Sequence, residues 1–324
     1  MTIAHFDIPI WQQEYLSSNL SSEANDTHLF FEQVQIDQET IEKIKDAEIL
    51  TIFIHTQFTK EILDKLPNLK LIVTRSTGYD HIDLVACQSR NAVVCNVPTY
   101  GTQTIAEHVF GLLLNISHNL NTLINRTRQS NFEYRDSLGF DLAGKTLGLI
   151  GAGKIGQSVA SLAKAFGMKV VAFDIYQNTE KAQEIGYEYV TKDELLSRSD
   201  VISLHCLLSD QTKDILGKDN FAKIKPGSVI INTARGDLVE NSDLLLGLET
   251  GIFKAVGADT IQNESKIKNG SIDEIQKKLL AHPGFFFTPH SAYYTREAMQ
   301  RILDTTCQNI LAFEKGEIIN QVKN

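Results

Sequence analysis

Short apolar runs alternate with amphipathic helical patterns along most of the chain. In the first hundred residues the runs predict strands at 2–6, 28–34, 49–55, 69–74 and 92–97. Helical patterns lie between these strands, near residues 11–19, 38–46, 60–66 and 83–90. Continuous apolar strands that alternate with helices are typical of a parallel sheet covered on both faces.

A long helical pattern at 103–129 separates this block from a second alternation. The strands of the second block are predicted at 146–150, 169–173, 201–205, 228–232, 255–259 and 285–288. A last helical pattern runs from about 295 to 315 and ends at Gly316. The pattern therefore predicts an α/β protein with two doubly wound parallel-sheet domains and a cleft between them.

The turn after the first strand of the second block is rich in glycine. Gly151, Gly153 and Gly156 have G-x-G-x-x-G spacing, and Asp174 follows the next strand, 18 residues past the third glycine. This spacing in a strand–turn–helix–strand unit favours dinucleotide binding, with pyrophosphate at the helix N-terminus and ribose hydroxyls on the acid. The alternative interpretation is an ordinary α/β turn that is rich in glycine and binds no dinucleotide. The predicted NAD-binding residues in this unit are Gly151, Gly153, Lys154, Ile155, Gly156 and Asp174.

The glycine motif assigns roles to the two blocks. Residues 100–291 are predicted to form an NAD-binding Rossmann domain. Residues 1–99 are predicted to form a flavodoxin-like substrate domain, completed by residues 292–324, so that this domain is discontinuous.

Composition narrows the choice of partners. The 324 residues are 42% hydrophobic and carry a formal net charge of −9, without a basic run. We therefore expect neither nucleic acid nor a membrane as the main partner. The N-terminus has no basic segment followed by an apolar one, and the four cysteines lack metal-ligand spacing. The sequence thus predicts a cytoplasmic protein with free thiols and without a metal site.

Three strands of the second block end in residues that can do chemistry. Arg235 follows one strand, Asp259 and Glu264 follow the next, and His290 follows the last. Arginine suits a carboxylate or a polarised carbonyl, histidine can move a proton near neutral pH, and a carboxylate can hold the histidine. Arg235 as a surface ion-pairing residue and His290 as a structural histidine are the alternatives. Together the arginine, the carboxylate and the histidine suggest hydride transfer to a carbonyl next to a carboxylate.

Two other histidines lie near these elements. His205 ends a strand of the predicted NAD-binding domain and is expected to line the cofactor pocket. His108 lies within the long helix and is expected to be a structural hydrogen-bonding group.

Six motifs follow in order along the chain: RSTGYDHID at 75–83, VPTYGTQTIAEH at 97–108, the glycine motif, NTARG at 232–236, the acidic pair of 259 and 264, and TPHSAYYT at 288–295. With these motifs the whole chain resembles the D-isomer-specific 2-hydroxyacid dehydrogenases, and most closely their D-lactate dehydrogenase branch. The resemblance implies an enzyme that interconverts pyruvate and D-lactate with NAD, and a homodimer formed through the NAD-binding domain. A dehydrogenase for a larger 2-oxo acid and a non-enzymatic NADH-sensing regulatory protein are the alternatives.

The resemblance also implies roles for individual residues. Arg235 would hold the 2-oxo acid, and His290 would be the acid/base, with Glu264 as its partner. The substrate would further be held by the amides of Thr77 and Gly78 and by the side chains of Tyr100 and Tyr293. The nicotinamide would contact Thr233, Ala234 and Asp259.

Overall fold

The computed structural model describes residues 1–20, 26–264, 267 and 270–322. The chain divides into two compact units, one formed by residues 1–100 with 295–324 and the other by residues 101–294. Each unit contains one sheet whose strand pairs are all parallel, with helices packed on both faces. The predicted fold class, two doubly wound parallel-sheet domains, is therefore confirmed.

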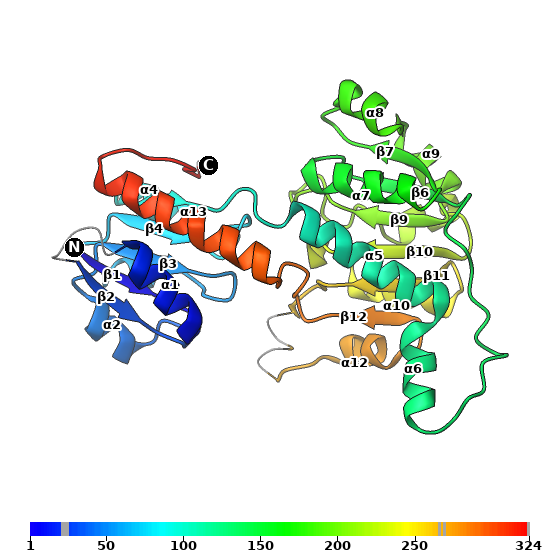
Figure 1. Cartoon of the computed structure of the whole chain (residues 1–324), viewed down its shortest axis with the longest axis horizontal. Coiled ribbons are helices and arrows are strands. Elements are labelled where there is room, and N and C mark those ends of the chain that lie inside the picture. The colour runs from blue at the N-terminus through cyan, green and yellow to red at the C-terminus, as the bar shows by residue number, and fades with distance from the viewer. Residues whose placement is uncertain (21–25, 265–266, 268–269, 323–324) are drawn as a thin grey trace. The chain divides into compact units, whose positions relative to one another are not determined.

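The first unit has a five-stranded sheet in the order β2-β1-β3-β4-β5, which is the flavodoxin-like order. Its strands are β1 (Thr2–His5), β2 (Thr27–Phe30), β3 (Ile49–Ile52), β4 (Leu71–Thr74) and β5 (Val93–Cys95). Its helices are α1 (Ile10–Leu20), α2 (Gln38–Ile44), α3 (Lys60–Leu63), α4 (Leu84–Ser89) and α13 (Arg296–Glu314). Figure 1 shows α13, in orange and red, lying along the blue and cyan strands of this unit.

Alternate strand residues bury the two faces of this sheet. Ile3 packs in one core with α1 and with Leu303 of α13. Ala4, the next residue of β1, packs in the opposite core with Ile44 of α2. Because neighbouring side chains of a strand point to opposite faces, a strand buried on both sides must be apolar throughout.

The second unit has a seven-stranded sheet in the order β12-β11-β10-β9-β6-β7-β8. Its strands are β6 (Thr146–Ile150), β7 (Lys169–Phe173), β8 (Glu188–Tyr189), β9 (Val201–Leu204), β10 (Ser228–Asn232), β11 (Phe253–Ala258) and β12 (Phe285–Phe287). Its α-helices are α5 (Thr102–His118), α6 (Leu120–Arg128), α7 (Lys154–Ala165), α8 (Thr179–Ile185), α9 (Lys192–Arg198), α10 (Asn241–Glu249) and α12 (Glu274–Ala281). Two 3₁₀ turns follow β9 and β10, η1 (Lys218–Lys223) and η2 (Gly236–Leu238).

Helices cover both faces of this sheet as well. Ile231 of β10 packs in a core with α5 and α7, which lie against each other. Ile230, one residue earlier, packs in the opposite core with α9, α10 and α12. In both sheets the strand ends therefore lie between layers of packed helices. This packing fixes the positions of the residues that follow each strand.

The prediction of one long helix at 103–129 is wrong, because two helices cover this range. The α5 helix ends at His118, and Asn119 takes a left-handed conformation with φ 52° before α6 begins. Asparagine tolerates this conformation better than most residues, so it can end one helix and redirect the chain. Among the described helices, none is both long and apolar enough to cross a membrane.

Candidate active site

The glycine turn joins β6 to α7, and its shape requires glycine. Gly151 has φ +98°, and a Cβ there would stand 2.5 Å from the backbone nitrogen of Cys206. A Cβ on Gly156 would stand 2.4 Å from the carbonyl oxygen of Gly151. At Gly153, by contrast, a Cβ would meet no heavy atom of the described residues within 4 Å. The turn is thus closely packed at its first and third glycines and open at its second, as a bound pyrophosphate requires.

The α7 helix begins at the open glycine of this turn. Gly153 is the N-cap residue, and no side chain within the described residues caps the helix there. Lys154 is exposed in the first turn, and Ile155 is partly buried against the α5–α7 core. Backbone amides at a helix N-terminus bind anions well, so this end of α7 suits the phosphates of NAD.

Asp174 ties the end of β7 to the glycine turn. Its Oδ2 accepts a hydrogen bond from the backbone amide of Ala152 at 2.7 Å, and its Oδ1 accepts one from the amide of Tyr176 at 2.9 Å. An ionised carboxylate has about four acceptor sites, so two remain for ribose hydroxyls. Asp174 therefore has a structural task beyond the one that the sequence indicates.

Two side chains on neighbouring strands fit a cofactor wall. His205 follows β9, and its Nε2 lies 2.8 Å from the hydroxyl of Ser203. Burial lowers the pKa of His205 to about 4, so the ring is neutral near pH 7. Thr233 follows β10, and its Oγ1 is buried without a hydrogen-bond partner among the described residues. A buried hydroxyl in this state fits a contact with a bound group, because leaving it unpaired is costly.

The loop that carries Arg235 is held by its own strand. The side chain of Asn232 accepts from the amide of Ala234 at 3.1 Å and donates to the carbonyl of Arg235 at 2.9 Å. The guanidinium of Arg235 donates to the carbonyl of Ala234 at 2.8 Å. A Cβ on Gly236 would stand 2.1 Å from the backbone carbon of Ile261, so this loop packs directly against the segment that leads to Glu264.

His290 and Glu264 are in direct contact. Nδ1 of His290 lies 2.6 Å from Oε1 of Glu264, and both side chains are about three-quarters buried. His290 also has a left-handed backbone, with φ 55°. The ring of Tyr293 stands edge-on to the imidazole, with centroids 6.4 Å apart. The geometry allows Glu264 to orient the imidazole and to balance its positive charge.

Asp259 organises the loop around His290. Its buried carboxylate accepts hydrogen bonds from the hydroxyl of Thr288 and from the amides of Ser291 and Ala292. His108 adjoins the same cluster, with Nε2 3.0 Å from the Thr288 hydroxyl. Burial lowers the pKa of His108, against the opposing effect of the Asp259 charge.

The sheet brings these groups to one edge. Arg235, Glu264 and His290 follow β10, β11 and β12, which are neighbours in the sheet. The sheet continues from β10 through β9, β6 and β7, and these strands are followed by His205, the glycine turn and Asp174. Carboxyl ends of parallel strands are where open α/β sheets bind ligands. Sequence reasoning missed Asn232 and Thr288, although both stand beside the motif residues.

The predicted substrate residues of the first unit lie in its own loops. The hydroxyl of Thr77 donates to the carbonyl of Val97 at 2.9 Å, and the carbonyl of Gly78 accepts from Ser76 at 2.6 Å. The carbonyl of Tyr100 accepts from Arg301 of α13 at 2.7 Å. These bonds hold the segments after β4 and β5 in place within the unit.

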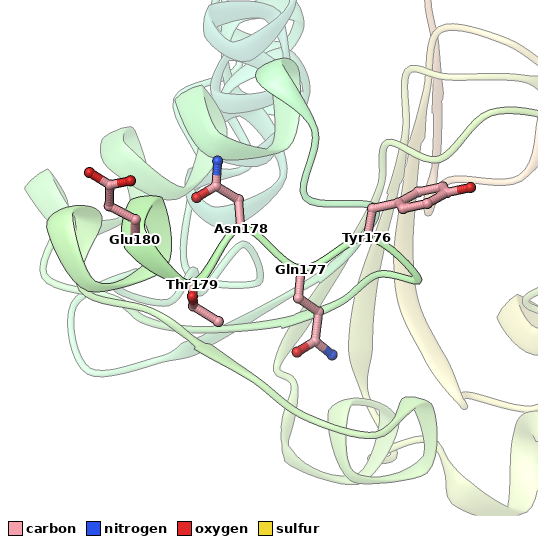
Figure 2. Close-up of a pocket in the computed structure, with 5 residues that line it drawn as sticks. All are labelled: Tyr176, Gln177, Asn178, Thr179 and Glu180. Carbon is pink, nitrogen blue, oxygen red and sulfur yellow. The ribbon is translucent and has the colours of Figure 1, made fainter.

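A surface hollow of about 460 Å³ lies beyond Asp174, between β7 and α8. Figure 2 shows its lining, which is one continuous segment: Tyr176, Gln177, Asn178, Thr179 and Glu180. The hollow contains none of the candidate catalytic residues.

Comparison with known proteins identifies the class. Residues 110–292 match the NAD-binding domain of the D-isomer specific 2-hydroxyacid dehydrogenases. The chain is 32% identical to D-lactate dehydrogenase of Escherichia coli, with 98% of both chains covered. The protein therefore belongs to the D-isomer specific 2-hydroxyacid dehydrogenase family, and it is an oxidoreductase that uses NAD.

Two further similarities bear on the reaction. The chain is 35% identical to hydroxypyruvate reductase of Blautia hydrogenotrophica, with 88% of both chains covered. It also superimposes on D-lactate dehydrogenase from Aquifex aeolicus, solved with NAD and lactic acid. That comparison has a TM-score of 0.87 and 32% identity, and it covers 97% of this chain and 96% of the other.

Proposed function

We propose that this protein is a D-lactate dehydrogenase that interconverts pyruvate and D-lactate, with His290 as the acid/base. The observation that carries the proposal is the 2.6 Å contact between His290 and Glu264 at the edge that also holds the glycine turn. Two of the three similar proteins described above are D-lactate dehydrogenases. We further propose that residues 100–291 bind NAD and that residues 1–99 with 292–324 form the substrate domain.

Each proposed residue has one task in the reduction. The guanidinium of Arg235 binds the 2-oxo acid and polarises its carbonyl. Amides of Thr77 and Gly78 bind the carboxylate, while Tyr100 and Tyr293 line the pocket. Thr233, Ala234 and Asp259 place the nicotinamide. When bound, NADH supplies the hydride for the carbonyl carbon.

His290 completes the reaction by proton transfer. Its Nδ1 faces Glu264, so Nε2 is the nitrogen that gives a proton to the new hydroxyl oxygen. Glu264 keeps the ring oriented and stabilises its protonated form. In the oxidative direction the neutral ring takes the hydroxyl proton back as the hydride leaves.

A kinetic panel tests the substrate. Pyruvate, 2-oxobutyrate, hydroxypyruvate, phenylpyruvate and a branched 2-oxo acid would each be reduced with NADH, and the chirality of the product would be determined. We expect the highest kcat/KM with pyruvate and a D-configured product. A higher kcat/KM for hydroxypyruvate or for a bulky acid would identify that acid, in place of pyruvate, as the substrate. The class of reaction would stay the same. Absence of turnover with every acid would favour a regulatory NADH-binding protein.

Asp174 predicts a preference for NADH over NADPH. A 2′-phosphate would place negative charge against a carboxylate that the amides of Ala152 and Tyr176 hold in place. Like charges brought together in a binding site cost several kcal/mol, so we expect kcat/KM to be about 100-fold or more lower with NADPH. Measuring both cofactors at saturating pyruvate decides this. Equal use of the two would remove Asp174 from the ribose site.

We also propose that the protein is a cytoplasmic homodimer formed through the NAD-binding domain. An apolar arm, defined here as α6 with residues 129–143, supports this. None of the residues of α6 is buried, and five large apolar side chains of the arm are exposed: Leu120, Ile124, Phe132, Tyr134 and Leu138. The guanidinium of Arg126 binds both oxygens of Asp136, which stiffens the arm. Several large exposed apolar side chains on one segment are typical of a contact between subunits.

Changing the arm should change the oligomeric state. Leu138, 90% exposed, would be replaced by Asp, with Leu246→Asp on α10 as the matched control. We expect analytical ultracentrifugation to show a dimer for the wild type and the control, and a weaker dimer or a monomer for Leu138→Asp, because a charge in an apolar interface is costly. A wild-type monomer would contradict the proposal, and so would an unchanged dimer in Leu138→Asp.

A further inference from the structure

A continuous line of hydrogen bonds leads from α5 to the loop of His290. Nε2 of His108 lies 3.0 Å from the hydroxyl of Thr288, and that hydroxyl donates to Oδ1 of Asp259 at 2.5 Å. The same carboxylate accepts from the amides of Ser291 and Ala292, each at 2.9 Å. His108 and Thr288 are 180 positions apart in the sequence, so the two residues meet only because of the fold.

The two amides at the end of this line directly follow a residue in an uncommon conformation. His290 has φ 55°, in the left-handed region, and its own amide donates to the carbonyl of Thr288 at 2.8 Å. A residue with a side chain stays in this region only when its surroundings hold it there. Asp259 meets that need, because it fixes the next two amides and thereby the path of the chain on leaving His290.

Hydrogen-bond roles along the line are determined by the acceptor at its centre. An ionised carboxylate can only accept, so the single hydroxyl proton of Thr288 points to Asp259. The hydroxyl oxygen must then accept from His108, which therefore carries a proton on Nε2. Nε2 of His108 is 3.7 Å from Oδ1 of Asp259, too far for a direct hydrogen bond. His108 thus reaches the carboxylate through Thr288.

We propose that His108 and Thr288 are positioning residues for His290, acting through Asp259. His108 orients the Thr288 hydroxyl, the hydroxyl orients the Asp259 carboxylate, and the carboxylate holds the left-handed backbone from which the imidazole projects. The inference rests on the proposed function, since it assigns these residues to the delivery of the His290 proton. A displacement of about 1 Å in a reacting group can cost about 100-fold in rate, so a loosened loop has a measurable effect.

The first experiment removes the hydroxyl without changing the size of the side chain. In Thr288→Val we expect kcat for pyruvate reduction to fall about 10-fold or more, and NADH affinity in a fluorescence titration to fall much less, because most of the proposed cofactor contacts lie in the glycine turn and Asp174. Thr288→Ser keeps the hydroxyl and should recover most of kcat. Wild-type kcat in Thr288→Val would overturn the proposal. So would a loss of NADH affinity as large as the loss in kcat, which would place the effect in the cofactor site.

A second measurement does not depend on activity. Hydrogen exchange of the peptide covering residues 289–295, read by mass spectrometry, should be faster in Thr288→Val than in the wild type or in Thr288→Ser. Unchanged exchange would mean that Thr288 does not support the Asp259 contacts. If wild-type protein reduces no 2-oxo acid, the proposed function fails, and this measurement still decides whether the line of hydrogen bonds holds the loop.

A double-mutant cycle tests whether His108 acts through Thr288. His108→Leu should lower kcat in the wild-type background, whereas His108→Gln, which keeps an N–H donor at a similar reach, should recover most of it. In the Thr288→Val background, His108→Leu should cost nothing more, because the link is already broken. Additive losses would show that His108 acts by another route and would overturn its place in the line.

Discussion

His290→Ala is expected to lower kcat for pyruvate reduction by about 100-fold or more, because a positioned general acid contributes about 10²–10⁴-fold. Binding of NADH should stay nearly intact. The residues proposed to hold the pyrophosphate and the ribose of the cofactor follow β6 and β7, whereas His290 follows β12 at the end of the strand order. The proposal therefore predicts a loss in kcat with little change in the dissociation constant of NADH.

A matched control separates this effect from a general loss of histidine. His118 is exposed at the end of α5, and His118→Ala should have wild-type kinetics. Stopped-flow single turnovers would measure the chemical step, and a fluorescence titration would measure NADH affinity. If His290→Ala keeps a kcat within about twofold of the wild type, proton transfer does not pass through His290.

The strand pattern of the chain could be predicted because most strands are buried on both faces. Strand β10 is buried at every position, so its apolar run is unambiguous. Strand β8 has only two residues, Glu188 and Tyr189, and neither is buried, so no apolar run indicates it. The break at Asn119 was missed because the apolar period continues across it. One residue with φ 52° redirects the helix without changing the hydrophobic pattern.

The candidate site was predictable in its residue types and not in its contacts. Strand ends locate Arg235, Glu264 and His290, since parallel strands deliver the following residues to one edge. The left-handed backbone of His290 has no local signal such as glycine. The acceptor role of Asp259 toward the amides of Ser291 and Ala292 joins residues 32 and 33 positions apart, which spacing cannot reveal. Such contacts depend on tertiary packing.

The contact between Glu264 and His290 predicts that the Glu264 charge contributes to proton transfer. Pyruvate reduction uses the protonated imidazole as its acid, and the Glu264 carboxylate lies 2.6 Å from Nδ1. A charged hydrogen bond of this kind orients the ring and balances the charge that the ring carries during the reaction. Glu264→Gln keeps the size and a hydrogen bond but removes the charge.

The variant should lose activity in both directions. One charged hydrogen bond contributes about 1.5–3 kcal/mol, so kcat/KM for pyruvate reduction should drop by about 10-fold or more. Oxidation of D-lactate passes through the same transition state, so its kcat/KM should fall by the same factor at the same pH. Glu249→Gln, an exposed glutamate at the end of α10, is the control and should have wild-type kinetics. Measuring kcat/KM of the three proteins in both directions, with a fluorescence titration of NADH, tests this. If Glu264→Gln keeps kcat/KM within about twofold of the wild type, the Glu264 charge does not act on His290.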